Sequence, residues 1–297
     1  MAGPTDYDAT VTELCERMLV TVVGDAGFWG RRLFLVGGLV PRYLYGPSRA
    51  GAQAYVGSRD VDLTVVLMVD YPTPDSYATL ERNLLDAGFR QAPFAADPAY
   101  RWRKEANAAS LILEFIVDTE AVPPGREFAP GARSGSAARS KPRFQALNVR
   151  GSRLVSLDCK LVLIGAERLD HGGAANVGVQ VAGLLPFIVL KMFTFVDRHH
   201  ARDVYDIVWT LANHRDGPEG AGREMAASPV AADPLAVEAV GLLRGRFAEI
   251  RGDAPMAYAA FLGVAGSLRS TSQLRIEAVE TIRATLKGFD RARGPAG

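Results

Sequence analysis

Short apolar runs occur throughout the first half of the chain, and each run is typical of a buried β-strand. The strands predicted in this way are 33–38, 61–69, 100–104 and 110–118. Between them, apolar residues recur at helical spacing, as Leu14, Met18 and Val22 do before Gly24. The helices predicted in this half are 9–24, 39–46 and 76–89. The first half therefore predicts strands alternating with helices.

Helical periodicity dominates after Pro186. Residues 186–214 are nearly continuous at helical period and predict one long helix, unless His199 and His200 form a junction. Further helices are predicted over 235–250, 255–263 and 272–290, with 216–234 as a linker. Strands are thus expected before about residue 160, and helices dominate after it. This distribution predicts an α/β (α+β) fold, in which a mixed sheet flanked by helices is followed by a helical domain. The predicted domains are 1–160 and 161–297.

Composition leaves the partner open but limits the compartment. The chain has 297 residues, 48% hydrophobic and 23% charged, with a formal net charge of +1, which neither indicates nor excludes a polyanionic partner. No window approaches the roughly twenty apolar residues of a membrane helix, and the N-terminus lacks the basic start of a signal peptide. Cys15 and Cys159 are too few for a disulfide framework, so a reducing cytoplasm is expected.

The segment 121–153 differs from its surroundings because it is rich in Pro, Gly, Ser and Arg. We interpret it mainly as a long mobile loop, with a short strand near 144–149. It holds seven basic residues against one acid, Glu127. This basic segment is the feature that favours an RNA partner, and a solvated loop is its alternative interpretation.

Two aspartates, Asp60 and Asp62, stand at the start of the apolar run "LTVVLMV". Side chains alternate faces along a strand, so both would point the same way, roughly 6–7 Å apart. Two like charges so placed repel each other, and a divalent cation between them removes the conflict. The pair therefore predicts a Mg²⁺ site, against the alternative of two solvated acids at a strand end.

Glu114 interrupts the apolar run "LILEFIVD". A charged group inside such a strand is costly unless it is paired or binds a ligand. If this strand lies beside 61–69, Glu114 joins Asp60 and Asp62 around one or two Mg²⁺ ions, an arrangement used for phosphoryl and nucleotidyl transfer. Asp118, on the same face at the strand's end, is the alternative third carboxylate.

Gly37 and Gly38 follow the strand "LFLV" and precede a short helix, which leaves backbone N–H groups free to approach phosphate. The order "FLVGGLVPRYLYG…VGSRDVDLTVVL" resembles the nucleotidyltransferase superfamily that shares its catalytic fold with DNA polymerase beta. The resemblance implies a nucleotidyltransferase-fold sheet in the N-terminal domain. It also assigns NTP contacts to Gly37, Gly38 and Ser58.

A second stretch, "FIVLKMFTFVDRHHARDVYDIVWTL", resembles the Lys…Arg…(Lys/Arg)-Asp-x-x-Asp pattern of the AbiEii/AbiGii-type nucleotidyltransferases. On one continuous helix, its charged side chains would form a single stripe able to bind a triphosphate, with Asp206 orienting a cation. The resemblance assigns NTP binding here to Lys191, Arg198, Arg202, Asp203 and Asp206. A solvated charged helix face is the alternative.

Together the motifs predict a Mg²⁺-dependent nucleotidyltransferase that moves a nucleotidyl group from an NTP to a hydroxyl. The resemblance implies a tRNA 3′ end as acceptor and an antitoxin protein as partner, as in toxin–antitoxin pairs. The alternatives are a small-molecule, aminoglycoside-type transferase, an inactive nucleotide- or protein-binding member of the fold, and a metal-dependent phosphoester hydrolase. No membrane partner is expected.

Overall fold

The computed structural model describes residues 9–45, 55, 61–67, 74–91, 98–106, 109–129, 144–263 and 269–294. The chain has the predicted α+β class, with a mixed sheet and a helical C-terminal region. It divides into two compact units. The sheet unit consists of Ala9–Leu39 and Ser58–Ala182, and the helical unit of Met1–Asp8, Val40–Gly57 and Gly183–Gly297.

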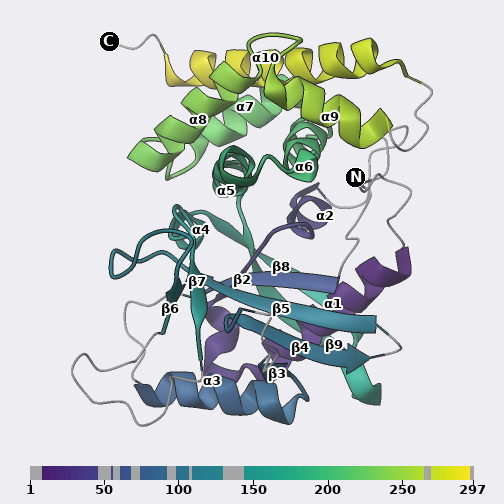
Figure 1. Cartoon of the computed structure of the whole chain (residues 1–297), viewed down its shortest axis with the longest axis vertical. Coiled ribbons are helices and arrows are strands. Elements are labelled where there is room, and N and C mark those ends of the chain that lie inside the picture. The colour runs from purple at the N-terminus through teal and green to yellow at the C-terminus, as the bar shows by residue number, and fades with distance from the viewer. Residues whose placement is uncertain are drawn as a thin grey trace. The chain divides into compact units, whose positions relative to one another are not determined.

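The sheet unit contains one nine-stranded mixed sheet (Figure 1). Its strands are β1 Leu33–Val36, β2 Val61–Leu67, β3 Arg90–Gln91, β4 Arg101–Ala106, β5 Ala109–Val117, β6 Glu127–Phe128, β7 Ala146–Asn148, β8 Cys159–Glu167 and β9 Ala174–Ala182. The main order is β3-β4-β5-β2-β1-β9-β8, with β6 and β7 paired beside β5. β2 is antiparallel to β1 and parallel to β5. This places the end of β1 and the start of β2 at the same end of the sheet.

Helices cover one face of this sheet. α1 (Ala9–Asp25) packs on β2, β8 and β9 (Figure 1). α3 (Pro74–Asp86) brings an aromatic ring to the core. Tyr77 of α3 lies 5.8 Å from Phe144, whose ring in turn lies 4.9 Å from that of Phe115. Phe115 and its alternating neighbours Leu111 and Leu113 are fully buried on this face. Alternation along β5 therefore leaves Glu114 on the opposite face.

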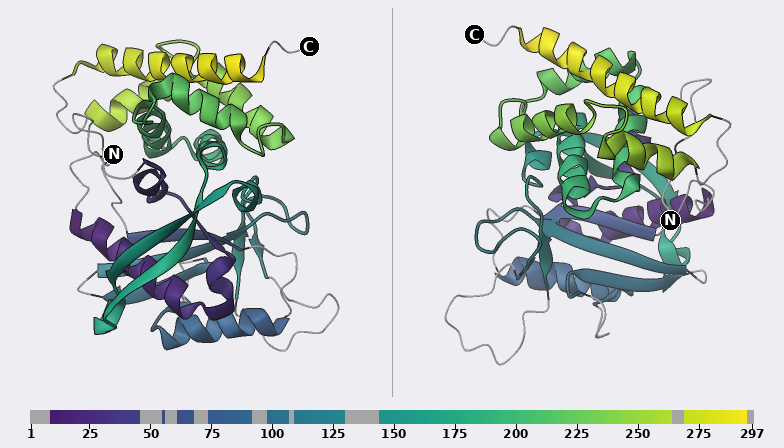
Figure 2. Two further views of the ribbon diagram at one scale, coloured as in Figure 1. Left: turned by 180° about the vertical axis from the view of Figure 1, so that it is seen from behind. Right: turned by 45° about the horizontal axis from the view of Figure 1, so that its top comes forward.

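The helical unit is built around close helix contacts. Its helices are α2 Val40–Tyr45, α5 Leu184–Arg198, α6 Ala201–Ala212, α7 Gly217–Ala227, α8 Pro234–Arg246, α9 Asp253–Gly263 and α10 Thr271–Arg293. α10 packs along α7 and α9, as Figure 2 also shows. At the α7–α10 crossing, a Cβ added to Gly222 would lie 1.9 Å from the Thr285 carbonyl oxygen, so only glycine permits this approach. None of the helices in the described ranges combines the length and apolarity needed to span a bilayer.

Most elements predicted from periodicity are confirmed, from α1 through β5 and again from α8 to α10. The expected end of the strands near residue 160 is wrong, because β8 and β9 follow it, and the units divide between Ala182 and Gly183. These strands were missed because apolar Leu161 and Leu163 occupy an exposed face, which removes the usual alternation. The short strand expected near 144–149 is confirmed as β7.

In the helical region, the alternative of a junction at His199 and His200 is confirmed in place of one long helix over 186–214: His199, with φ 53°, ends α5 in a left-handed conformation. A second prediction is wrong. The expected linker 216–234 contains α7, whose glycines look like loop residues in the sequence but are needed where the helix meets α10.

Candidate functional site

The first candidate region is one end of the sheet, where β1, β2 and β5 lie side by side. The parallel register pairs Asp62 with Ile112 and Thr64 with Glu114. By strand alternation, positions 62 and 114 therefore lie on one face of the sheet. They are on neighbouring strands, and position 114 lies two residues beyond the direct partner of position 62. The predicted neighbourhood of the strands 61–69 and 110–118 is confirmed.

Gly37 and Gly38 lie at the same end of the sheet. They directly follow β1, whose last residue, Val36, pairs with Thr64 of β2. Gly37 has φ 86°, in the left-handed region that a side chain disfavours, so glycine is required at this turn. The turn thus brings a flexible backbone next to the strand that begins just after Asp60.

Glu114 is largely buried and paired. Its carboxylate accepts a 2.6 Å hydrogen bond from Arg101 Nε on β4, with 19% of the Glu114 side chain exposed. Arg101 stands directly opposite Glu114 in the antiparallel β4–β5 register. The cost of a carboxylate in this apolar strand is thereby offset by a charge-assisted hydrogen bond.

Asp118 has a different role from Glu114. Its Oδ2 atom accepts hydrogen bonds from the backbone N–H groups of Gly151, at 2.9 Å, and Arg153, at 3.2 Å. These bonds fix the turn that precedes α4 (Leu154–Leu157). The geometry therefore gives Asp118 a structural function.

The remaining members of the predicted metal site are only partly visible. Asp60 and Ser58 lie outside the described residues, and Asp62 is known by its backbone position alone. Among the side chains that are described, no three His, Cys, Asp or Glu residues gather at metal-binding distances. The donor types nevertheless suit Mg²⁺, which prefers carboxylate oxygens.

The second candidate region lies in the helical unit, where α5 and α6 pack against each other. Lys191 Nζ of α5 lies 2.8 Å from Asp203 Oδ1 and 2.7 Å from Asp206 Oδ2, both on α6. Arg202 donates from Nε to Asp206 Oδ1 at 2.8 Å. The junction at His199 thus replaces the predicted single-helix stripe by an ion-pair network between two helices.

Tyr55 completes this network. Its hydroxyl donates to Asp206 Oδ1 at 2.8 Å and accepts from Arg202 Nη2 at 3.0 Å. Its ring stacks on that of Tyr205 at 6.0 Å and lies 4.8 Å from Trp209. Tyr55 is therefore held to α6 by both hydrogen bonds and ring contacts.

The network is buried and electrically balanced. Asp206 is fully buried, and the side chains of Lys191 and Asp203 are 13% and 8% exposed. Burial alone would raise the pKa of Asp206, but Arg202 and Lys191 more than offset this and hold it below its ordinary value. For Lys191, burial lowers the pKa, yet Asp203 and Asp206 raise it above its usual range. Both partners therefore stay charged at neutral pH.

No model of a known protein family matches the chain, and a search of curated proteins finds no significant relative.

Of the predicted NTP-binding residues in the helical unit, four come together: Lys191, Arg202, Asp203 and Asp206. Arg198 does not join them, because its side chain is exposed at the end of α5.

The sequence prediction missed three residues of the two candidate regions: Tyr55, Arg101, and Arg103 of β4, which stands opposite Ile112, the β5 partner of Asp62. The two arginines could have been found from the alternation in "YRWRK", which puts the buried Trp102 and Lys104 on the other face. No comparable pattern marks Tyr55.

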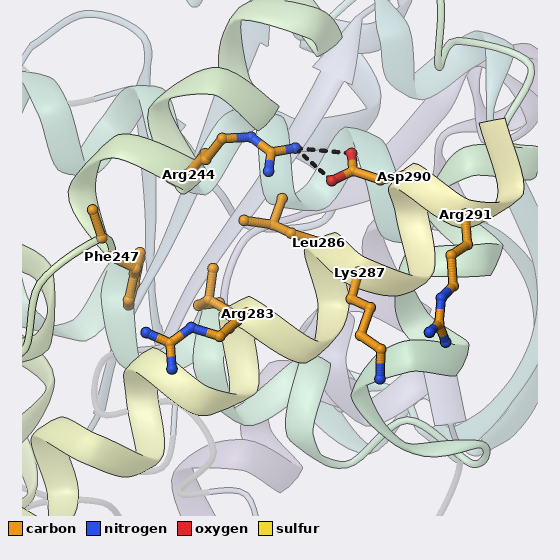
Figure 3. A pocket seen from close by; sticks show the side chains of 9 residues that line it. Arg244, Phe247, Arg283, Leu286, Lys287, Asp290 and Arg291 are labelled. Carbon is orange, nitrogen blue, oxygen red and sulfur yellow. Dashed lines mark hydrogen bonds and ion pairs between the residues drawn. The ribbon is translucent and has the colours of Figure 1, made fainter. Parts of the chain in front are cut away.

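A surface groove of about 480 Å³ lies between α8 and α10 (Figure 3). Its floor includes buried Phe247, Ile282 and Leu286, and charged side chains form its rim. The rim cations are paired with acids: Arg244 with Asp290, Arg283 with Glu280, and Lys287 and Arg291 with Glu219. The ion pairs of Arg244 with Asp290 and of Lys287 and Arg291 with Glu219 connect α10 to α8 and α7.

Proposed function

We propose that the protein is a Mg²⁺-dependent nucleotidyltransferase. The observation that carries the proposal is the β1–β2–β5 arrangement, in which Gly37–Gly38 lie beside the first half of β2 and Glu114 stands opposite Thr64, on the same face as position 62. A glycine turn beside a carboxylate-bearing strand start suits a substrate that combines phosphate with a divalent cation. No comparable arrangement supports a serine or cysteine nucleophile in the described residues.

The carboxylates Asp60, Asp62 and Glu114 would hold Mg²⁺. When bound, the metal would lower the pKa of the attacking hydroxyl and neutralise charge on the leaving pyrophosphate. Arg101 holds the Glu114 carboxylate oriented in this semi-buried position through a 2.6 Å hydrogen bond. Arg103, two residues further along β4, stands opposite Ile112, which itself pairs with Asp62. Arg103 therefore adds a second cation to β4, level with position 62 of β2.

In the reaction, the acceptor oxygen attacks the α-phosphorus of the NTP, and the bond from that phosphorus to the bridging oxygen of pyrophosphate breaks. The hydroxyl proton passes to a carboxylate base, the role that Glu114 would take as the alternative to completing the metal site. Gly37 and Gly38 would offer backbone N–H groups to the phosphate oxygens. Ser58 is assigned to the same phosphate contacts.

The helical-unit network would supply cations for the triphosphate. Lys191 and Arg202 are held by Asp203 and Asp206, so their positions are fixed before the ligand arrives. Preorganised cations bind phosphate with a smaller loss of side-chain entropy. Tyr55, which contacts Arg202 and Asp206, stands five residues before Asp60 in the sequence. Arg198 is retained as a peripheral phosphate contact.

The acceptor is a hydroxyl of either RNA or a small molecule. The basic segment 121–153 favours RNA, for which a tRNA 3′ end is the first candidate. Such an activity would be toxic in a cell, and an antitoxin protein would then be the expected partner in the cytoplasm. A small hydroxylated acceptor would retain the same chemistry with a different biological role.

The test is a transfer assay with the full chain, Mg²⁺ and each α-labelled NTP. One arm offers total tRNA, and the other a panel of hydroxylated small molecules. The control variants are Asp60→Asn/Asp62→Asn, expected to be inactive, and Asp118→Asn, which changes the structural carboxylate just after the strand that holds Glu114. Label transferred by the wild type and by Asp118→Asn only would support the proposal.

Other outcomes of this assay would contradict it. Release of free NMP without transfer would indicate a hydrolase. Binding of Mg²⁺-NTP without any chemistry would indicate an inactive nucleotide-binding member of the fold. If the protein neither bound Mg²⁺-NTP nor transferred label, the three carboxylates would lose their proposed role altogether.

A further inference from the structure

β8 forms one edge of the sheet. It is the last strand in the order and, among the described residues, pairs only with β9. The strand is nine residues long, contains no proline, and has uncharged residues from Leu161 to Ala166. Long edge strands without such protection offer unpaired N–H and C=O groups to another strand. β8 thus has the features of an interface strand.

The exposed face of β8 is apolar. Leu161 and Leu163 are 69% and 74% exposed, and Leu157, just before the strand, is 59% exposed. Leu161 lies over Gly178 of β9, so no larger side chain shields it. The opposite face of the hairpin is covered, since α1 packs there and Ile164 and Val179 are buried. Clustered exposed leucines of this kind mark an interaction site.

We infer that β8 pairs with β8 of a second copy of this chain, in antiparallel orientation about a two-fold axis at Val162. A two-fold axis perpendicular to the sheet keeps the faces of the two copies aligned, as an isologous interface requires. With Val162 on the axis, Leu161 of each copy stands opposite Leu163 of the other. The four leucines then form two direct cross-strand pairs.

Charge also favours a second copy as the occupant. In this register Lys160 stands opposite Ile164 and Asp158 opposite Ala166, so no two like charges face each other. The formal net charge of +1 adds little long-range repulsion between identical chains. The strand can thus pair with itself without opposing like charges. The inference does not depend on the proposed enzymatic activity.

The first experiment measures the mass of the full chain in solution over a concentration series. Wild type is expected as a dimer, and Leu161→Lys/Leu163→Lys as a monomer, because four lysines would then face each other in two cross-strand pairs of like charge. The matched control Val237→Lys/Ile276→Lys replaces two exposed apolar residues of the helical unit, 55% and 46% exposed, and should stay dimeric. A monomeric wild type, or a dimer that survives in the β8 variant, would overturn the inference.

Cross-linking tests the register independently of whether the lysine variant folds. In a Cys159→Ser background, Leu161→Cys and Leu163→Cys together should give a disulfide-linked dimer. The new cysteine at position 161 of one copy then stands opposite the new cysteine at position 163 of the other. Either cysteine alone should link much less. Efficient linking by Leu163→Cys alone would place the axis at residue 163 and contradict the register about Val162. Absence of any link in the double variant would contradict the strand pairing itself.

Discussion

Lys191 and Asp206 form an ion pair, Nζ to Oδ2 2.7 Å, between two helices that are separated by a left-handed residue at His199. The pair is almost fully excluded from water and is balanced by Asp203 and Arg202. Removing one partner of a buried pair leaves the other charge uncompensated, which costs more than the pair itself contributes.

Replacing Asp206 by alanine should therefore destabilise the protein strongly. We expect a loss of about 3 kcal/mol or more in the free energy of unfolding, measured by urea denaturation. The control Arg198→Ala, at an exposed side chain of the same region, should stay within about 0.5 kcal/mol of wild type. Equal effects of the two variants would show that the network is not buried in solution.

The hydroxyl of Tyr55 gives a second prediction, with a tyrosine of the same unit as its control. Tyr55→Phe removes a donor to Asp206 and an acceptor for Arg202, and should cost about 1–2 kcal/mol. The hydroxyl of Tyr45 is buried and has no hydrogen-bond partner in the described part of the chain. Tyr45→Phe should therefore leave stability unchanged or raise it slightly. A larger loss for Tyr45→Phe than for Tyr55→Phe would reverse this assignment.

The charge network also predicts a pH dependence. The pKa of Asp206 is lowered in the folded state, so its stabilising contribution is present above the ordinary aspartate pKa and is lost as the pH falls through the folded value. Lys191 has a raised pKa, so its contribution is lost only in strong alkali. The urea midpoint difference between wild type and Asp206→Asn should be constant near neutrality and shrink in acid, below about pH 4. If this midpoint difference grew in acid, the pKa of Asp206 would be raised in the folded state and not lowered.

The α7–α10 crossing makes a prediction about glycine. A Cβ at Gly222 would meet the Thr285 carbonyl at 1.9 Å, and one at Gly288 would meet the Glu219 carbonyl at 2.1 Å. Gly222→Ala should therefore cost about 1–3 kcal/mol or more through backbone displacement. Gly241, inside α8, has no atom within 4 Å of an added Cβ, so Gly241→Ala should stabilise by about 0.5–1 kcal/mol. Thermal unfolding should show a lower midpoint temperature than wild type for Gly222→Ala and a higher one for Gly241→Ala.

The sequence predicts local features of this protein better than their assembly. The apolar run 61–69 and the helical period of 272–290 each identify their element, because burial imposes a pattern on neighbouring residues. The break at His199 depends on a single left-handed residue, and α7 on glycines that look like loop residues. Neither can be derived from periodicity alone.

The candidate site shows the same division. The position of Glu114 beside β2 follows from its place in an apolar run, once the two strands are known to be neighbours. Its partner Arg101 could have been inferred from alternation in β4. Tyr55 could not, because it reaches α6 from a segment without periodicity, and only the tertiary structure brings them together.

The final prediction concerns which of two carboxylates is functional: Glu114 on β5 or Asp118 just after it. Glu114→Gln keeps the shape of the side chain but removes the negative charge, so Mg²⁺-dependent transfer should fall by a factor on the order of 10²–10⁴. Asp118→Asn keeps an oxygen that can accept from the N–H groups of Gly151 and Arg153, so transfer should stay near the wild-type rate. Steady-state rates of label transfer, with thermal unfolding of each variant as a check on folding, measure the contrast.

The reverse result would be equally informative about the site. If Asp118→Asn abolished transfer and Glu114→Gln did not, the reacting groups would lie at the end of β5, and Glu114 would serve only to hold Arg101 in the sheet. If both variants lost activity without unfolding, the turn at residues 151–153, which Asp118 fixes, would itself be required for catalysis. Arg101→Gln then separates the two, because it should impair transfer only if the ionised Glu114 carboxylate takes part.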